Sequence, residues 1–296
     1  MIELGSRRGL AEPSPSKGGP GLERLRSYLL HQLAEIERND PVVRMLGSDA
    51  ESLHDLRVAV RRSRAVLRAA REVFDETWLK SLRAELRWLA CELAPARDQD
   101  VLWERLVEER AESDPDVEPI LKLLETDRRR ARARLMRALE SKRYVRLVDK
   151  LRNATVHPPV RATDLSLERI AAREFGRLKR SIRALGPRPS DAALHRARIR
   201  AKRARYAAEM IEPIAGKRAR KFIAAAKAFQ DTVGTHQDAV VAEELIRAVA
   251  TRSNSTEVAL AAGRVIERQR ARRERVRGSL PRTLKKLERR GREAWT

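Results

Sequence analysis

Apolar residues recur every three or four positions along most of this chain, which is the spacing of one face of an α-helix. Between residues 22 and 38, for example, leucine or isoleucine occupies positions 22, 25, 29, 33 and 36. The period predicts a helix that ends near Pro41, because proline has no N–H to continue the helical hydrogen bonds. Alanine, leucine, arginine and glutamate dominate while valine, isoleucine and aromatic residues are scarce, which also favours helix over strand. The sequence therefore predicts an all-α fold.

The other expected helices follow from the same spacing and from the residues that interrupt it. In the first half they cover 52–74, 77–93, 98–112 and a stretch from 119 to between 140 and 152, with Pro95 as a break. In the second half they cover 167–185, 191–211, 217–233, 237–252, 256–278 and 281–294, with breaks at 186–190 and at Pro213. Residues 1–20 are predicted to be a disordered tail, and 153–166, with two prolines, a linker. The chain then divides into repeat one (21–152), the linker and repeat two (167–294).

One basic stretch occurs twice. Residues 54–68 read HDLRVAVRRSRAVLR and residues 195–209 read HRARIRAKRARYAAE. Alignment of the two stretches gives the pairs His54/His195, Arg57/Arg198, Arg61/Lys202, Arg62/Arg203 and Arg64/Arg205. The first copy ends in Arg68 where the second has Glu209, so we expect the basic row of the second copy to be weaker at that end.

The basic side chains of the first copy lie beside its apolar face. On a helix that turns about 100° per residue, an arc of about 80° contains His54, Arg57, Arg61, Arg64 and Arg68. An apolar stripe that includes Leu53, Leu56 and Val60 lies next to this arc. Charge that serves only solubility would lie opposite the core. The row is therefore predicted to face a groove or an interhelical channel, with Arg62 and Arg203 in a second row. Tyr206 lies within the arc of the second copy and is predicted to pack there, with a contribution of its hydroxyl as the alternative.

Two later segments also align, LACELAPARDQDV at 89–101 and FQDTVGTHQDAVV at 229–241. Together with the residues just before them they give the pairs Ala94/Gly234, Asp98/Asp238 and Arg87/Lys227. Each aspartate follows a short break and is predicted to cap a helix. The two halves repeat after about 140 residues, which is too long a period for a solenoid. The duplication predicts two similar helical bundles, related by a pseudo-twofold axis, around a basic central groove or pore.

The formal net charge is +23, from 65 lysines and arginines against 42 aspartates and glutamates. Such a charge repels itself in the folded state, so a polyanion is the expected partner: nucleic acid, an anionic membrane surface or an inorganic polyanion. A genomic bias toward arginine is the alternative explanation of the composition. Cys91, the single cysteine, is predicted to be a small core residue. No apolar run of about 18 residues and no signal-peptide h-region is present, so we expect a cytoplasmic protein without a membrane span.

Residues that would support catalysis are not grouped in the sequence. The five histidines form no HxxxH or HxH set, no serine or cysteine stands in a nucleophile elbow, and no glycine-rich phosphate loop is present. We therefore expect no metal, no cofactor and no catalytic residue. Binding is favoured instead, because arginines one helical turn apart place charges about 5–6 Å apart, a spacing that can follow a chain of phosphates. Aromatic residues make up only 4%, so base stacking has little support, and non-sequence-specific nucleic-acid binding is the alternative.

The doubled H-x-x-R-[VI]-x-x-[RK]-R-x-R pattern resembles that of the CHAD family, the conserved histidine α-helical domain. The resemblance covers residues 21–294 and implies an all-helical fold of two four-helix-like bundles around a basic central surface. It also implies binding of inorganic polyphosphate and association with polyphosphate granules. Carried onto this sequence, the resemblance implies that phosphate is contacted by His54, Arg57, Arg61, Arg64, His195, Arg198, Lys202 and Arg205. The wider candidate set adds Arg62, Arg68, Arg87, Arg203 and Lys227.

The triphosphatase-like CYTH domain that often accompanies this family is missing from the sequence. We therefore expect binding without catalysis, and a role as an accessory to a polyphosphate-processing enzyme is a further alternative.

Overall fold

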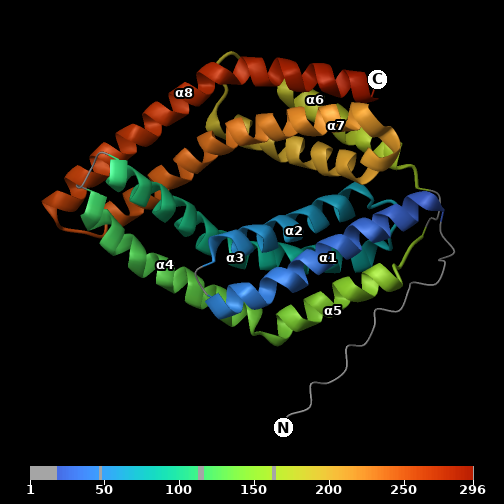
Figure 1. Cartoon of the computed structure of the whole chain (residues 1–296), viewed down its shortest axis with the longest axis horizontal. Coiled ribbons are helices and arrows are strands. Elements are labelled where there is room, and N and C mark those ends of the chain that lie inside the picture. Colours follow the sequence, from blue (N-terminus) through green and yellow to red (C-terminus); the bar gives the residue numbers. More distant parts are fainter. Residues whose placement is uncertain (1–18, 47–48, 113–116, 162–164, 296) are drawn as a thin grey trace, which may run out of the picture.

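The computed structural model describes residues 19–46, 49–112, 117–161 and 165–295, and these ranges are almost entirely α-helical (Figure 1). The predicted all-α fold is confirmed. Within these ranges the helices are α1 (Pro20–Leu46), α2 (Ala50–Ala69), α3 (Glu76–Glu112), α4 (Glu118–Leu139), α5 (Lys142–Val156), α6 (Leu167–Arg183), α7 (Asp191–Ala250) and α8 (Thr256–Trp295). The predicted tail lies outside the described residues, apart from its last two positions.

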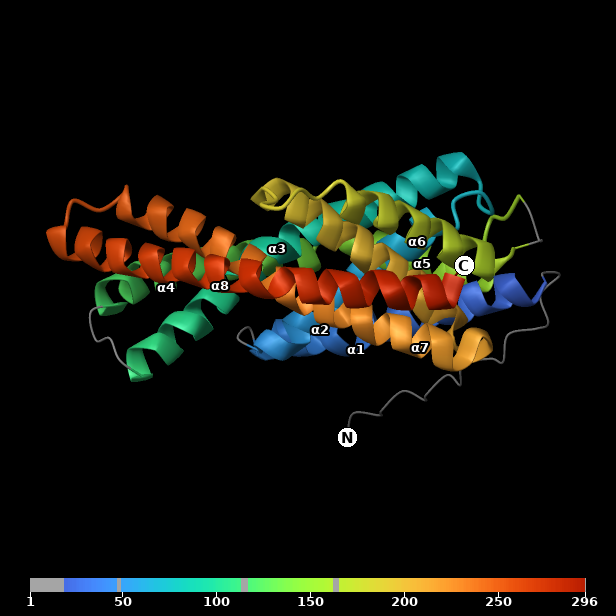
Figure 2. The same cartoon turned by 90° about the horizontal axis from the view of Figure 1, so that it is seen from above.

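The helices form two layers with an opening between them. In Figure 1 the lower layer contains α1, α2, α5 and part of α3, and the upper layer contains α6, α7 and the second half of α8. Figure 2 shows α8 running along the length of the molecule. None of the described helices combines the length and the apolar content needed to cross a bilayer.

The described residues form three apolar cores. The first joins α1, α2, α3 and α5, and it also takes in Ala207, Met210 and Ile211 of α7. The second lies within the upper layer, between α6, α7 and α8. The third lies at the far end, where Leu106 of α3 and Ile246 of α7 pack with α4 and α8. Because the first and third cores contain residues of both halves, they fix the two layers to each other. The internal duplication, its pseudo-twofold axis and the repeat boundaries stay predictions.

Helix α7 is a hairpin of two helical segments. Gly216, at φ 58° and ψ −135°, is the position inside it with non-helical backbone angles. A positive φ is easily adopted only by glycine, so the chain reverses there. The two arms then run side by side, which places the side chain of Arg198 against the backbone of Gln230. The break was expected at Pro213 and lies three residues later, because glycine rather than proline permits the reversal.

Three other prolines do not lie at helix boundaries as predicted. Pro41, Pro95 and Pro281 lie inside α1, α3 and α8. An interior proline costs a helix about 3 kcal/mol, but buried residues on both sides, such as Leu93 and Ala96 around Pro95, pack the two flanking segments. Tertiary packing therefore outweighs the local preference.

Several predicted boundaries move by a few residues. Asp49 caps α2, three residues before the predicted start at 52, because its carboxylate accepts a hydrogen bond from the backbone N–H of Ser52 at 3.0 Å. The expected long helix from 119 is divided, since Ser141 caps a separate α5. The first residues of the predicted linker belong to α5. The carbonyl of Pro159 then accepts a hydrogen bond from the N–H of Asp75 at 2.8 Å, which ties the linker to the start of α3. Linker residues 162–164 lie outside the described residues.

Candidate anion-binding site

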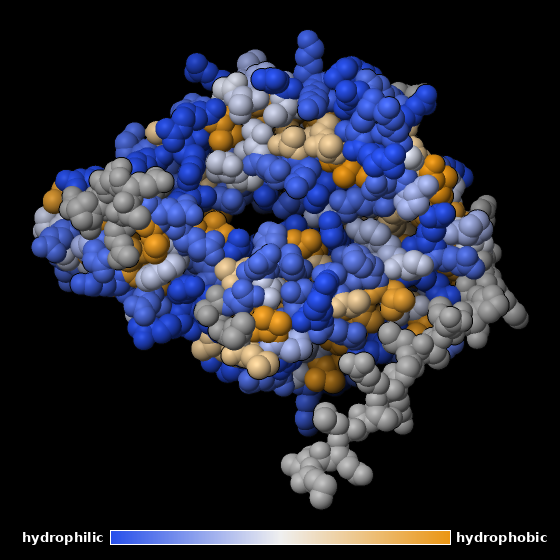
Figure 3. All heavy atoms as spheres, viewed as in Figure 1, coloured by the Kyte–Doolittle hydropathy of each residue, from blue (hydrophilic) through white to orange (hydrophobic). Residues whose placement is uncertain are grey.

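The two predicted basic segments, one on α2 and one on the first arm of α7, face the same cavity. It has a volume of about 510 Å³, and α3 and the second arm of α7 complete its walls. Figure 3 shows an opening at the centre of the molecule that is surrounded largely by hydrophilic residues. Seven arginines and one lysine line the cavity, against two aspartates. With six more cationic than anionic side chains, the cavity is suited to an anion.

The structure brings eight of the predicted residues together on this wall: His54, Arg57, Arg61, Arg64, Arg87, His195, Arg198 and Lys202. Sequence reasoning missed two further cations, Arg97 and Arg105, and the amide of Gln237, which lies 2.9 Å from Nδ1 of His195. The sequence could have indicated Arg97, because it lies next to Asp98 in the aligned segment. Arg105 had none that separates it from the other arginines.

Three of the arginines are each held by one hydrogen bond. Nη1 of Arg57 donates to Oδ1 of Asp98 at 3.0 Å. Nε of Arg61 donates to the hydroxyl oxygen of Tyr206 at 2.8 Å. Nε of Arg198 donates to a backbone carbonyl at 3.2 Å. A guanidinium has five N–H donors, so each of these side chains is oriented and still has donors for a ligand.

Like charges and burial lower the pKa values of several cavity groups. Burial and the nearby guanidinium charges, above all that of Arg61, lower the pKa of the Lys202 amine to about 6. Burial also lowers the pKa of Arg198, which Asp238 partly offsets. The pKa of His54 falls below its usual value because of burial and the charge of Arg97. The cavity therefore disfavours its own positive charge, a cost that a bound polyanion would remove.

Five predicted residues do not line the cavity. Arg62 and Arg205 lie behind the wall, where both guanidiniums approach the carboxylate of Glu209, at 3.5 and 3.4 Å. Arg205 is therefore turned away from the row that its counterpart Arg64 joins. Lys227 lies on an exposed face of α7, away from the cavity.

Arg68 and Arg203 belong to a flanking arginine cluster, which we define as Arg68, Arg83, Arg200 and Arg203. Burial lowers the pKa of Arg203 to about 10, with Arg68 as the next cause. Burial followed by the charge of Arg83 lowers the pKa of Arg68. The charge of Arg83 also acts on Arg64 of the cavity wall, while the carboxylate of Glu174 partly offsets the positive charge around Arg68 and Arg203. Arg83 lies one helical turn before Arg87, a spacing that could have identified it.

Three further predictions are wrong. Cys91 is exposed on the cavity wall rather than buried. It lies two residues, about 200°, from both Leu89 and Leu93 of the buried stripe. Asp98 and Asp238 do not cap helices, because α3 continues through Pro95 and α7 continues through Gly234. Both aspartates instead line the cavity.

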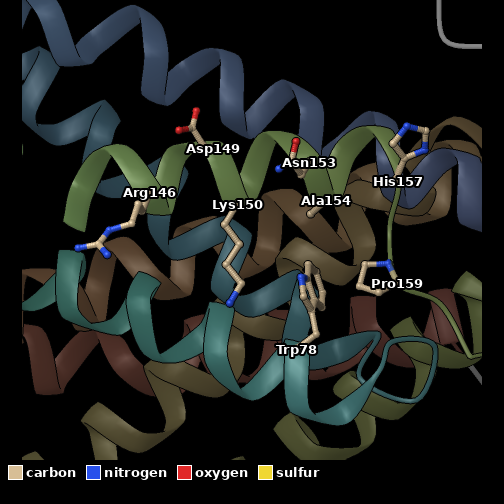
Figure 4. A pocket seen from close by; sticks show the side chains of 8 residues that line it. All are labelled: Trp78, Arg146, Asp149, Lys150, Asn153, Ala154, His157 and Pro159. Carbon is tan, nitrogen blue, oxygen red and sulfur yellow. The ribbon is translucent and has the colours of Figure 1, made fainter. Parts of the chain in front are cut away.

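A second pocket, of about 450 Å³, lies between the start of α3 and α5 (Figure 4). Its cations do not converge on one point. Lys150 donates to the hydroxyl of Ser81 at 2.6 Å, and Arg146 donates to a backbone carbonyl of its own helix at 3.2 Å. The central cavity is therefore the better anion site. Among the described residues no three His, Cys, Asp or Glu side chains are grouped to hold a metal ion.

A family model described as the CHAD domain matches residues 27–247, most of both layers. The chain belongs to the CHAD domain family. The uncharacterized protein Rv2226 of Mycobacterium tuberculosis is 30% identical over 299 residues, a match that covers 95% of this chain and 56% of that protein. A counterpart from a second strain matches to the same extent. This CHAD chain thus spans about half the length of the curated relatives it matches.

Two solved structures share the fold. The crystal structure of the CHAD domain from the plant Ricinus communis is similar with a TM-score of 0.75 and 27% identity, covering 94% of this chain and 96% of that one. PptA from Streptomyces chartreusis is similar with a TM-score of 0.72 and 24% identity, covering 90% of this chain and 100% of PptA. The CHAD architecture therefore extends beyond the matched family segment, over nearly all the described helices.

Proposed function

We propose that this CHAD protein binds inorganic polyphosphate in the central cavity without chemically altering it. The observation that carries the proposal is the excess of cations over carboxylates on a wall where the arginines are already oriented. Phosphate oxygens accept the paired N–H groups of arginine in bidentate fashion, which gives geometric fit as well as charge. A chain of phosphates repeats its charge along one line, as the cavity wall does at Arg57, Arg61 and Arg64 along α2.

Nucleic acid is the competing ligand, and two features of the cavity disfavour it. No aromatic side chain stands among the described residues of the lining, so bases have no surface on which to stack. The charged groups also face an internal cavity between two layers, which a thin phosphate chain can enter more readily than a duplex. Association with polyphosphate granules follows as part of the proposal.

The test is competition between long-chain polyphosphate and duplex DNA at equal phosphate concentration and physiological salt. We expect polyphosphate to displace DNA, with an affinity that falls steeply as salt rises because condensed counterions are released on binding. DNA binding of equal or greater strength would overturn the polyphosphate assignment. Release of orthophosphate from polyphosphate by the protein, with or without added divalent cation, would overturn the proposal of binding without catalysis.

A matched pair of variants tests the location of the site. Arg61→Gln removes a cavity charge, whereas Arg130→Gln removes one from an exposed position on α4. We expect the first to weaken polyphosphate binding roughly tenfold, since hydrogen bonds to charged groups are lost, and the second to have little effect. For Arg61→Gln, the slope of log affinity against log salt concentration should also become shallower by about one unit, because one phosphate contact is lost. Equal effects of the two variants would place binding on the general surface charge instead.

A further inference from the structure

Behind the cavity wall lies a group of polar and aromatic side chains, in which Tyr206 is buried and Tyr28, Arg62, Arg205 and Glu209 are partly buried; we call it the Tyr206 group. Tyr206 is 1% exposed and belongs to the first arm of α7. Its ring lies against two guanidiniums, with the central carbon of Arg62 5.7 Å and that of Arg205 5.0 Å from the ring centre. The hydroxyl of Tyr28 donates to Glu209 at 3.3 Å, and Glu209 in turn approaches both arginines.

One bond connects this group to the cavity. The hydroxyl oxygen of Tyr206 accepts the N–H of Arg61 Nε at 2.8 Å, and Arg61 is part of the cavity wall. Neither Tyr206 nor the other members of the group lines the cavity. The contact joins α2 to α7, so it also links the two predicted basic segments.

We propose that Tyr206 is a positioning residue for the anion site, holding the guanidinium of Arg61 in the orientation that presents its terminal nitrogens to a phosphate. This inference rests on the proposed function. Nε has a single N–H, so the bond to Tyr206 uses one of the five donors of Arg61 and leaves the four on the two terminal nitrogens. Those are the donors that match phosphate oxygens in pairs.

The chemistry of the acceptor supports this role. A carboxylate that oriented Arg61 would also neutralise its charge, as Asp98 does in part for Arg57 at 3.0 Å. A phenol oxygen orients the same nitrogen and leaves the full positive charge for the ligand. The side chain of a free arginine has several rotatable bonds that must be fixed on binding, so a preset orientation strengthens the complex.

The rest of the group explains why the phenol itself stays in place. Guanidiniums on a tyrosine ring make favourable cation–π contacts, which strengthen where water is excluded. The carboxylate of Glu209 contacts both Arg62 and Arg205. Glu209, which stands where the first sequence copy has Arg68, therefore has a structural role. Arg62 and Arg205 then support Tyr206 and are not available as direct phosphate contacts.

The experiment compares Tyr206→Phe with the wild type in two backgrounds, that of native Arg61 and that of Arg61→Gln. Phenylalanine keeps the ring and its guanidinium contacts and removes only the oxygen. We expect Tyr206→Phe to weaken binding of long-chain polyphosphate roughly fivefold when Arg61 is present, because the hydrogen bond that orients its guanidinium is lost. In the Arg61→Gln background the same change should have no further effect on affinity. Tyr144→Phe is the control, since Tyr144 is also buried and also has an arginine, Arg44, over its ring, at 5.4 Å, but lies outside the cavity.

A second measurement does not depend on the ligand. In the wild type the Nε–H of Arg61 should give a protected ¹⁵N NMR signal, which Tyr206→Phe should shift and expose to solvent exchange. An equal loss of affinity in both backgrounds would show that Tyr206 acts through general stability, and an unchanged Arg61 signal would show that the bond is absent. Either result would overturn the inference. Failure of the wild type to bind polyphosphate would overturn the proposed function, while the NMR comparison would still decide whether Tyr206 orients Arg61.

Discussion

The amine of Lys202 should make polyphosphate binding depend on pH. Its pKa of about 6 in the empty protein results from burial and from the positive charges of Arg57 and Arg61 on α2 and of Arg198 on α7, against which Asp238 is the main opposing charge. Above pH 6 the amine is therefore mostly neutral. A phosphate chain in the cavity favours the charged form and raises the pKa, so the complex takes up a proton that the free protein lacks.

The sign and the size of the effect follow from this difference. The complex holds more protons than its free components between about pH 6 and the higher pKa of the bound state, so affinity falls as the pH rises through that window. One proton corresponds to a factor of up to about ten in affinity for each pH unit. The pKa of His54 is held below its usual value, so its own titration affects the acidic end of the profile.

Isothermal titration calorimetry in two buffers of different ionisation enthalpy, near pH 7.5, measures the proton uptake directly. Long-chain polyphosphate keeps the contribution of titrating terminal phosphates small. We expect an uptake close to one proton for the wild type. Lys202→Arg should bind with a nearly flat pH profile, because its charge is permanent. Lys202→Met should also show a flat pH profile, but with a lower affinity for polyphosphate. If Lys202→Arg kept the pH slope of the wild type, another group would be responsible and the reasoning would be refuted.

Two further predictions concern stability and fit. Asp100 is fully buried and accepts hydrogen bonds at 2.7 Å from both Arg128 and Arg132. Asp100→Asn should therefore lower the free energy of unfolding, measured in denaturant, by about 3 kcal/mol. A loss under about 1 kcal/mol would contradict a structural role for these ion pairs. A methyl group at Gly234 would lie 2.8 Å from Nη2 of Arg198, so Gly234→Ala should displace that guanidinium and weaken polyphosphate binding several-fold. Because a side-chain end can yield without moving the backbone, the melting temperature should hardly change, and a large drop would show that the backbone itself is strained.

The sequence predicted the cationic wall well because the spacing of residues on one helix is a local property. His54, Arg57, Arg61 and Arg64 had to share a side of their helix, and the matched histidine at 195 indicated a second helix of the same kind. Both sets do line one cavity. The pairing of the two helices across that cavity was inferred from repetition alone.

What the sequence did not predict depends on contacts between distant segments. Pro41 and Pro95 were expected to end helices and Pro281 to begin one, but packing from other helices keeps those helices continuous. Arg105 and Arg200 could not be distinguished by pattern, because the chain contains 65 lysines and arginines and most of them have ordinary surface roles. The acceptor role of Tyr206 likewise appears only when α2 and α7 are side by side.

The apolar contacts on either side of the cavity have a consequence for how a long ligand would come and go. Ala207, Met210 and Ile211 join the layers on one side of the opening, and the core of α3, α4, α7 and α8 joins them on the other. The opening is thus framed all round by packed helices. A polymer that passed through such a frame could not be lifted out sideways, and would have to slide until one of its ends cleared the ring. Residence time would then grow with the length of the polymer even where the number of contacts stayed the same.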